Sequence, residues 1–151
     1  MARGRAREDN GSSAVEFALV MTPLLMIIFG IMQYGFYFWA MQGGADAGRH
    51  AARLAAVGNP ASCTAFVDAV KTTLSDISTS PSTTTVTRDY SKGPGNTASG
   101  VEIGDNVTVT VRFQSADLNL PFVPFVDDGW VDDTAKARVD YVPSSTVGDC
   151  P

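Results

Sequence analysis

The chain has 151 residues, a formal net charge of −5 and a 44% share of hydrophobic residues. An acidic chain lacks the basic patches that nucleic acid requires, so nucleic acid is excluded as a partner. The sequence has one histidine and no recognisable nucleophile, phosphate-binding or metal-ligand motif. It therefore predicts neither an enzyme with catalytic residues nor a cofactor-binding protein.

Residues 1–11, MARGRAREDNG, form a short polar leader with arginines at positions 3, 5 and 7. An excess of Lys and Arg beside a membrane span marks the cytoplasmic side. We therefore expect the N-terminus inside the cell and the bulk of the chain outside the cytoplasmic membrane.

A long apolar run follows the leader. From Ala14 to Ala40 the only formally charged side chain is Glu16. About 27 residues at about 1.5 Å each are enough to cross a hydrocarbon core of about 30 Å, so residues 12–40 are predicted to form a transmembrane helix in the lipid bilayer. The run is too long for a cleaved secretory signal, and no small-residue A-x-A site follows it.

Two residues inside the run require an explanation. An ionised carboxylate costs about 2.5 to 3.5 kcal/mol at the bilayer centre and less near its surface. Glu16 therefore needs a partner, unless it lies solvated at headgroup level. Pro23 lacks an N–H and should kink the helix, and the Thr22 hydroxyl is available to the freed carbonyl.

The start of the run resembles a known processing site. Gly11 is followed by Ser12-Ser13-Ala14-Val15 and then by Glu16-Phe17, which resembles the prepilins of the tight-adherence (Tad/Flp) branch of type IV pili. The stretch AVEFALVMTPLLMIIFGIMQYG is similar to the opening of TadE-like proteins, the pseudopilins or minor pilins of that machine. The resemblance implies that a prepilin peptidase recognises Glu16 and Phe17 and cleaves between Gly11 and Ser12. It also implies that the freed amine pairs with Glu16 of a neighbouring subunit during assembly.

Residues 41–57 are rich in Ala and are predicted to continue the same helix beyond the membrane. Glycines at positions 43, 44 and 48 suggest a flexible joint just above the bilayer. Gln33, together with the rings of Tyr34, Tyr37 and Trp39, is expected to form an interfacial belt. The turn residues at 58–60 should end the helix.

The remaining segment, 58–151, is predicted to be one extracytoplasmic α+β domain. A second helix fits Thr64–Ile77, with Ser62 as its N-cap. Residues 86–90 are β-prone, 106–113 alternate as a half-buried strand, and 134–141 alternate in the same way. We expect the last two strands to be antiparallel partners or close neighbours in a small sheet.

An apolar, Pro-containing excursion separates those two strands. Its large side chains either pack under the sheet or form an exposed surface that meets a partner subunit, and we favour the partner surface. The residues concerned are Phe122, Val123, Phe125, Val126 and Trp130. The nearby acids between Asp127 and Asp133 do not match the spacing of a calcium loop, so no metal is predicted there.

Cys63 and Cys150 are the only cysteines, and both fall on the predicted extracytoplasmic side. A disulfide between them would tie the start of the second helix to the C-terminal tail. The alternative is a pair of unpaired thiols.

The C-terminal part strengthens the resemblance, because VTVTVRF, LPFVPFV and AKARVDY are similar in kind and order to the tail of TadE-like proteins. The resemblance implies a minor pilin or pseudopilin that initiates, caps or primes a Tad/Flp pilus. Its partners would be the prepilin peptidase, other pilin and pseudopilin subunits and the membrane platform proteins, and its location the cytoplasmic membrane or the pilus. The main alternative is a signal-anchored surface binding protein that is neither processed nor polymerised. A major pilin is disfavoured, because major Flp pilins are little more than the helix.

Overall fold

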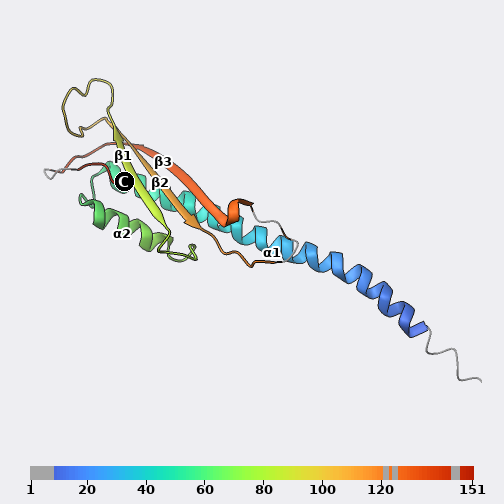
Figure 1. The fold of residues 1–151 in the computed structure, drawn as a ribbon. Helices are drawn as coiled ribbons and strands as arrows, with labels where there is room; N and C mark the ends of the chain where they lie inside the picture. The colour runs from blue at the N-terminus through green and yellow to red at the C-terminus, as the bar shows by residue number, and fades with distance from the viewer. Residues whose placement is uncertain (1–8, 121–122, 124–125, 144–146) are drawn as a thin grey trace, which may run out of the picture.

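The computed structural model describes residues 9–120, 123, 126–143 and 147–151. Its first element is α1, Asp9–Ala56, a single helix of 48 residues. One half of α1 carries the rest of the molecule, and the other half extends away from it alone (Figure 1). The predicted transmembrane segment and its extension are therefore one continuous helix.

The C-terminal end of α1 is closed by turn chemistry and by a distant segment. Gly58 adopts a left-handed conformation with φ of +60°, which glycine accepts without strain and which ends the helix as predicted. The backbone N–H groups of Asp140 and Tyr141 donate to the carbonyl of Ala56 at 2.9 and 3.2 Å. The chain that follows the sheet thus satisfies a carbonyl that the end of the helix leaves without a partner.

Three antiparallel strands form one sheet in the order β1-β2-β3. They are β1, Thr85–Ser91, β2, Asn106–Gln114, and β3, Trp130–Arg138. The predicted antiparallel pairing of the last two strands is confirmed, with Val109 opposite Ala135. The α+β fold class is likewise confirmed.

The predicted bounds of the third strand are wrong by several residues. Trp130 opens β3 opposite Gln114 instead of closing the apolar excursion. The Val139 N–H still donates to the Asp105 carbonyl at 2.8 Å, next to the last pair of the ladder. Beyond it the chain leaves the sheet, because the N–H groups of Asp140 and Tyr141 donate to the Ala56 carbonyl of α1. Tyr141, the last residue of the predicted strand, is 58% exposed. The alternating pattern alone did not show that the residues that pair with β2 begin at Trp130 and not at Thr134.

The second helix, α2, spans Cys63–Leu74 and is shorter than predicted. Ser62 is its N-cap residue by position but makes no side-chain capping bond, because its hydroxyl lies 3.0 Å from the Thr64 hydroxyl. One apolar face of α2 packs into the core, where Phe66, Val70 and Leu74 are buried.

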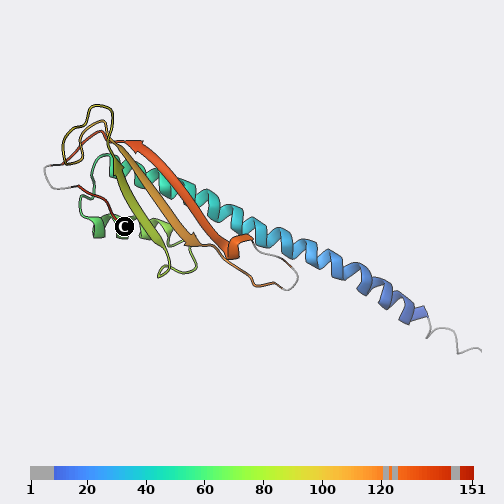
Figure 2. The ribbon, with the colours of Figure 1, turned by 45° about the horizontal axis from the view of Figure 1, so that its top comes forward.

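Both helices cover the same face of the sheet (Figure 2): α1 lies along β2 and β3, and α2 lies beside α1 and along β1. The core forms between these two layers. On β2 the alternating side chains Val107, Val109, Val111 and Phe113 are fully buried. The buried residues of α1 are mostly alanines, which allow the helix to lie close to the sheet: Ala40, Ala47, Ala51, Ala52, Ala55 and Ala56.

Candidate functional site

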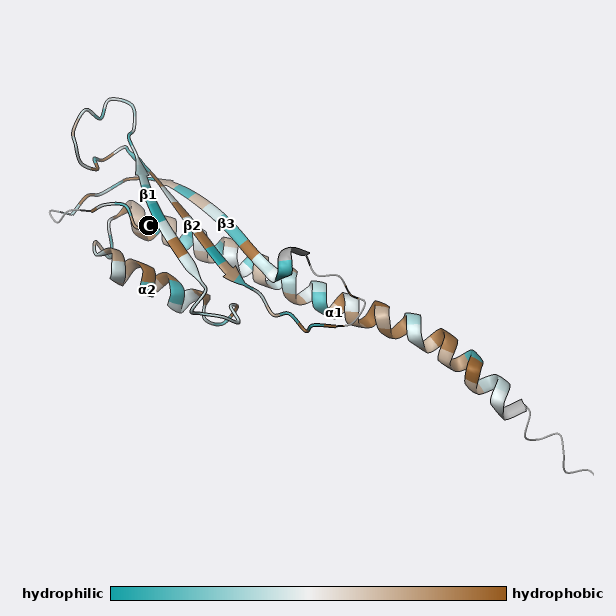
Figure 3. Ribbon diagram, viewed as in Figure 1, coloured by the Kyte–Doolittle hydropathy of each residue, from teal (hydrophilic) through white to brown (hydrophobic). Residues whose placement is uncertain are grey.

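The half of α1 that extends from the domain is uncovered and apolar. Residues 11–32 make no contact with the sheet or α2 that would bury a side chain, and their hydrophobic colouring stands out in Figure 3. α1 is long and apolar enough to cross a membrane. The large exposed side chains of this half are Val15, Phe17, Leu19, Val20, Leu24, Leu25, Met26, Ile27, Ile28, Phe29, Ile31 and Met32.

The residues of the predicted processing site lie at the beginning of this uncovered half. Gly11 and Ser12 are already helical, because α1 begins at Asp9, and both are exposed. Phe17 is 64% exposed, and the Glu16 side chain is exposed as well. Within the described part of the chain no side chain or backbone group pairs with Glu16. Most of the leader, residues 1–8, lies outside the described residues.

The helix continues through Pro23 without interruption. Pro23 removes the N–H that would bond the Leu19 carbonyl. The neighbouring Thr22 hydroxyl donates to the Ala18 carbonyl at 2.9 Å. The expectation that Thr22 serves the freed carbonyl is therefore wrong, since the hydroxyl bonds one residue earlier.

Gln33 marks the point where α1 meets the domain. Its side chain is 1% exposed, although it lies inside the most apolar stretch of the sequence. Its amide nitrogen donates to the Ala116 carbonyl at 3.1 Å, and its amide oxygen accepts from the Leu118 N–H at 2.9 Å. The Gln33 side chain is thus bonded inside the molecule and does not project outward, as a side chain of an exposed interfacial belt would. It fastens the loop that follows β2 to the helix.

The glycines predicted to form a joint instead allow close packing. A Cβ at Gly43 would lie 2.8 Å from Cδ1 of Ile77, and a Cβ at Gly44 would lie 2.8 Å from Cε1 of Phe113. A Cβ at Gly48 would lie 2.8 Å from Oδ2 of Asp133. The helix is continuous here and side chains of the domain lie close to its backbone, most tightly at Gly44 against the Phe113 ring, so a joint at these positions is contradicted.

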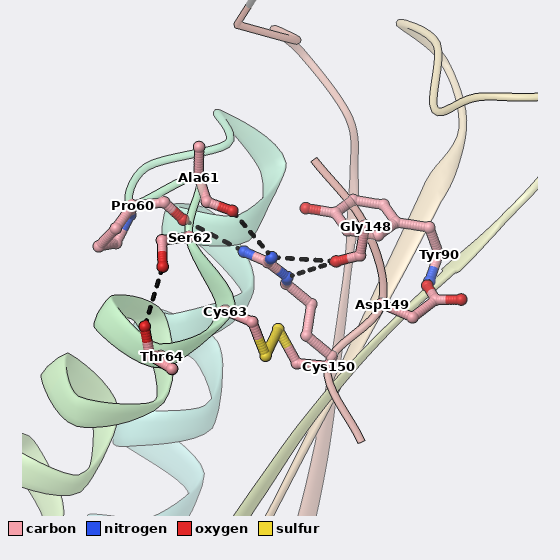
Figure 4. Close-up of a disulfide and its surroundings, with 10 residues drawn as sticks. Pro60, Ala61, Ser62, Cys63, Thr64, Tyr90, Gly148, Asp149 and Cys150 are labelled. Carbon is pink, nitrogen blue, oxygen red and sulfur yellow. Dashed lines mark hydrogen bonds between the residues drawn. A yellow bond between two sulfur atoms is a disulfide. The ribbon is translucent and has the colours of Figure 1, made fainter. Parts of the chain in front are cut away.

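The two cysteines are joined at the end of the domain farthest from the uncovered helix. Cys63 at the start of α2 and Cys150 in the tail form a disulfide with a Cα–Cα distance of 5.5 Å (Figure 4). Cys150 also pairs with Arg88 on the outer edge of β1 through two backbone hydrogen bonds of 2.7 and 2.9 Å. The tail therefore covers an edge that would otherwise be open.

Arg88 also holds the C-terminal tail in place. Its side chain is a buried cation, only 1% exposed. Its guanidinium donates to the carbonyls of Gly148 at 2.9 and 3.2 Å, Pro60 at 3.2 Å and Ala61 at 3.3 Å (Figure 4). It also lies 4.6 Å from the ring centroid of Phe66. Backbone carbonyls and an aromatic face thus take the place of a carboxylate partner.

The burial of Arg88 and Gln33 was not predicted, although the sequence carries a signal for each. Arg88 occupies a position of β1 that alternation with Val86 assigns to the core, and Gln33 is a lone amide within an apolar run. A polar residue at a position that pattern assigns to the interior requires hydrogen-bond partners.

The predicted partner surface is only partly within the described residues. Phe122 and Phe125 lie outside them, as does the side chain of Val126. Val123 is partly exposed. Trp130 is partly buried, and its ring lies 4.8 Å from the Arg112 guanidinium.

Two acidic groups near the ends of the sheet have structural partners. Asp132 lies 3.7 Å from Arg112, an exposed pair. Asp105 accepts hydrogen bonds from the Gly93 N–H at 2.7 Å, the Glu102 N–H at 2.8 Å and the Asn96 amide at 2.7 Å. The backbone bonds from Gly93 and Glu102 hold the pKa of Asp105 below its ordinary value. Among the residues with described side chains, no three His, Cys, Asp or Glu residues are placed to hold a metal ion.

Comparison with known proteins gives one match. A search of curated proteins and a search of solved structures returned no match. The family model described as TadE-like protein matches residues 11–53, which begin at the predicted cleavage site and include both halves of α1. The match leaves the looser resemblance after residue 100 untested. Residues 11–53 of this chain are thus a TadE-like segment, which indicates a protein associated with the Tad pilus.

Proposed function

We propose that the chain is a minor pilin or pseudopilin that initiates, caps or primes assembly of a Tad/Flp pilus after a prepilin peptidase cleaves between Gly11 and Ser12. The observation that carries the proposal is the uncovered half of α1. It is apolar on all sides, it matches the TadE-like family from Gly11 onward, and its one carboxylate has no partner in the described chain. A helix of this kind requires lipid or other helices around it.

Glu16 is the assembly contact in this proposal. A carboxylate in or near the bilayer is costly when it is unpaired, and a neighbouring subunit's N-terminal amine at Ser12 would offset that cost. Phe17 contributes an exposed ring next to the acid for recognition by the peptidase. The chain would act through helix packing, alongside other pilin subunits and the membrane platform, and not through catalysis.

The position of the domain fits this role. The close packing at Gly43, Gly44 and Gly48 makes the upper half of α1 part of the domain, so the domain and the anchor move together. A subunit of this shape presents a folded domain outside the membrane while its lower helix remains available for extraction into a fibre.

The substitution Glu16→Ala tests the assembly contact. The variant should be membrane-inserted and processed but should form no pili, because the acceptor for the neighbouring amine is missing. The matched control is Glu102→Ala, which removes an exposed glutamate in the domain and should leave pili unchanged. Normal piliation in the Glu16→Ala strain would falsify the pairing.

Whether residues 1–11 are removed distinguishes the proposed pilin from the alternative, a signal-anchored binding protein. A signal-anchored binding protein would keep residues 1–11, and Glu16 would be dispensable for its display. The N-terminal peptide of the membrane-extracted protein shows whether residues 1–11 are retained. Membrane fractionation and pilus counts by electron microscopy in the Glu16→Ala strain show whether Glu16 is dispensable.

A further inference from the structure

The loop that follows β2 runs beside α1 toward the uncovered half of the helix. Both ribbon views show it leaving the sheet and lying alongside α1 (Figures 1 and 2). Gln33 fixes the loop at a definite height through its bonds to Ala116 and Leu118. The loop therefore contacts α1 nearer to the N-terminus of the helix than the sheet does, because Phe113, at the end of β2, contacts the helix at Gly44.

Gln33, to which the loop is bonded, directly follows the uncovered residues 11–32 of α1. Residues 12–32 rise about 31 Å at about 1.5 Å per residue, which matches a hydrocarbon core of about 30 Å. If this segment spans the bilayer, Gln33 lies at the edge of the hydrocarbon. The buried Gln33 amide and the backbone groups that it bonds then sit where water and headgroups begin.

The described side chains around this level have the character of an interfacial layer. On α1, Phe36 and Trp39 are 43% and 54% exposed, and with Met32 and Gly35 they line a shallow apolar groove. On the loop, Leu118 is 41% exposed, and the exposed Asp117 precedes it. The sequence carries no charged residue between Asp117 and Asp127. Aromatic rings and short apolar segments beside polar groups favour the headgroup region.

We infer that the described part of the loop after β2, residues 116–120 and 123, rests on the headgroup layer of the same bilayer that α1 crosses, with the Leu118 side chain at the hydrocarbon edge. The inference depends on the membrane anchoring in the proposed function and adds a second lipid contact to it. Two contacts on different segments fix the tilt of the domain, so the disulfide end points away from the membrane. Lipid is the occupant because the loop is fastened to the anchor at the level where the anchor leaves the hydrocarbon.

The test uses tryptophan fluorescence in the full-length chain. In a background of Trp39→Phe and Trp130→Phe, one reporter at a time is introduced by Leu118→Trp, Ile103→Trp or Leu19→Trp. The protein is reconstituted into vesicles of phosphatidylethanolamine and phosphatidylglycerol that carry nitroxide lipids, with the nitroxide either near the headgroup or deep in the acyl chain. Ile103 is 70% exposed in the loop between β1 and β2 and serves as the water-facing control.

The reporter at position 118 should lose fluorescence to the shallow nitroxide by as much as native Trp39 does in Trp130→Phe protein. The reporter at position 19 should be quenched by the deep nitroxide, and the reporter at position 103 by neither. A Val123→Trp reporter repeats the measurement if Leu118→Trp alters the loop.

The other outcomes are distinguishable. Quenching at position 19 without quenching at positions 118 and 123 overturns the inference while the anchoring stands, and it leaves the loop open to a protein partner. An unquenched reporter at position 19 overturns the anchoring, and the inference fails with it.

Discussion

The two halves of α1 are parts of one helix with opposite packing. Below Gln33 the helix carries large apolar side chains that are exposed, whereas above it the buried residues are mostly alanine, with glycines where the domain comes closest. Large side chains suit a surrounding of lipid or of other helices, and small ones let a sheet approach the backbone. The change in side-chain size therefore marks where the domain begins, while the helix itself continues unbroken.

The largest expected effect comes from removing the disulfide, which holds the packed region at its far end. Cys63 and Cys150 are 87 residues apart, so Cys150→Ser should cost the domain about 2 to 5 kcal/mol of unfolding free energy, since the unfolded chain gains freedom. Denaturant unfolding in detergent, followed by near-UV circular dichroism, measures the loss.

Cys63→Ser and the double variant are the controls for this prediction. Both should match Cys150→Ser, because all three remove the same bond. Wild-type stability in any of them would contradict a stabilising role for the disulfide.

A bulky side chain on α1 should act differently above and below the boundary. Gly44→Val would place its side chain against the buried Phe113 ring and should destabilise the domain by about 1 to 3 kcal/mol through overpacking. Gly30→Val, below the boundary, is the matched control, since nothing lies within 4 Å of a Cβ there. Equal thermal stability of the two variants in detergent would show that the upper glycines are not packing positions.

The contact between α1 and the loop after β2 can be weakened by substituting Gln33. Gln33→Leu removes two hydrogen bonds and should make local opening of the loop after β2 easier by about 1 to 2 kcal/mol. Hydrogen exchange at the Leu118 amide reports that opening. Gln42→Leu alters an exposed glutamine on the same helix and should leave the exchange rate unchanged; faster exchange in both variants would point to a general effect of losing an amide.

The smallest effect is expected from acid, at the end of the domain far from the boundary. Because the folded pKa of Asp105 is below its ordinary value of 3.8, its contribution to stability is present above that value. It is lost as the pH falls through the lower folded pKa. The loop between β1 and β2 should then open, and exchange at the Gly93 and Glu102 amides should accelerate.

Asp105→Asn should remove this acid transition, while Asp140→Asn, at an exposed aspartate, should retain it. An unchanged transition in the Asp105→Asn protein would assign the acid sensitivity to other carboxyl groups.

Pattern and composition were sufficient to predict the helices and the strand alternation, and the family match over residues 11–53 agrees with the resemblance of that segment to TadE-like proteins. They could not place Gln33 or Arg88, because each is buried by segments far away in sequence. The Gln33 partners follow β2, and the Arg88 partners come from the α1–α2 connection and the tail. The start of β3 was missed for the same reason, since register with β2 determines it and the Trp130 ring resembles part of the apolar excursion.

Cleavage between Gly11 and Ser12 is the central claim, and intact-mass analysis tests it most directly. The full-length protein is extracted from membranes of cells with and without the prepilin peptidase, and its N-terminal peptide is sequenced by mass spectrometry. The account predicts a chain that begins at Ser12 only when the peptidase is present. A chain that keeps residues 1–11 in both preparations would contradict it and would favour a signal-anchored binding protein.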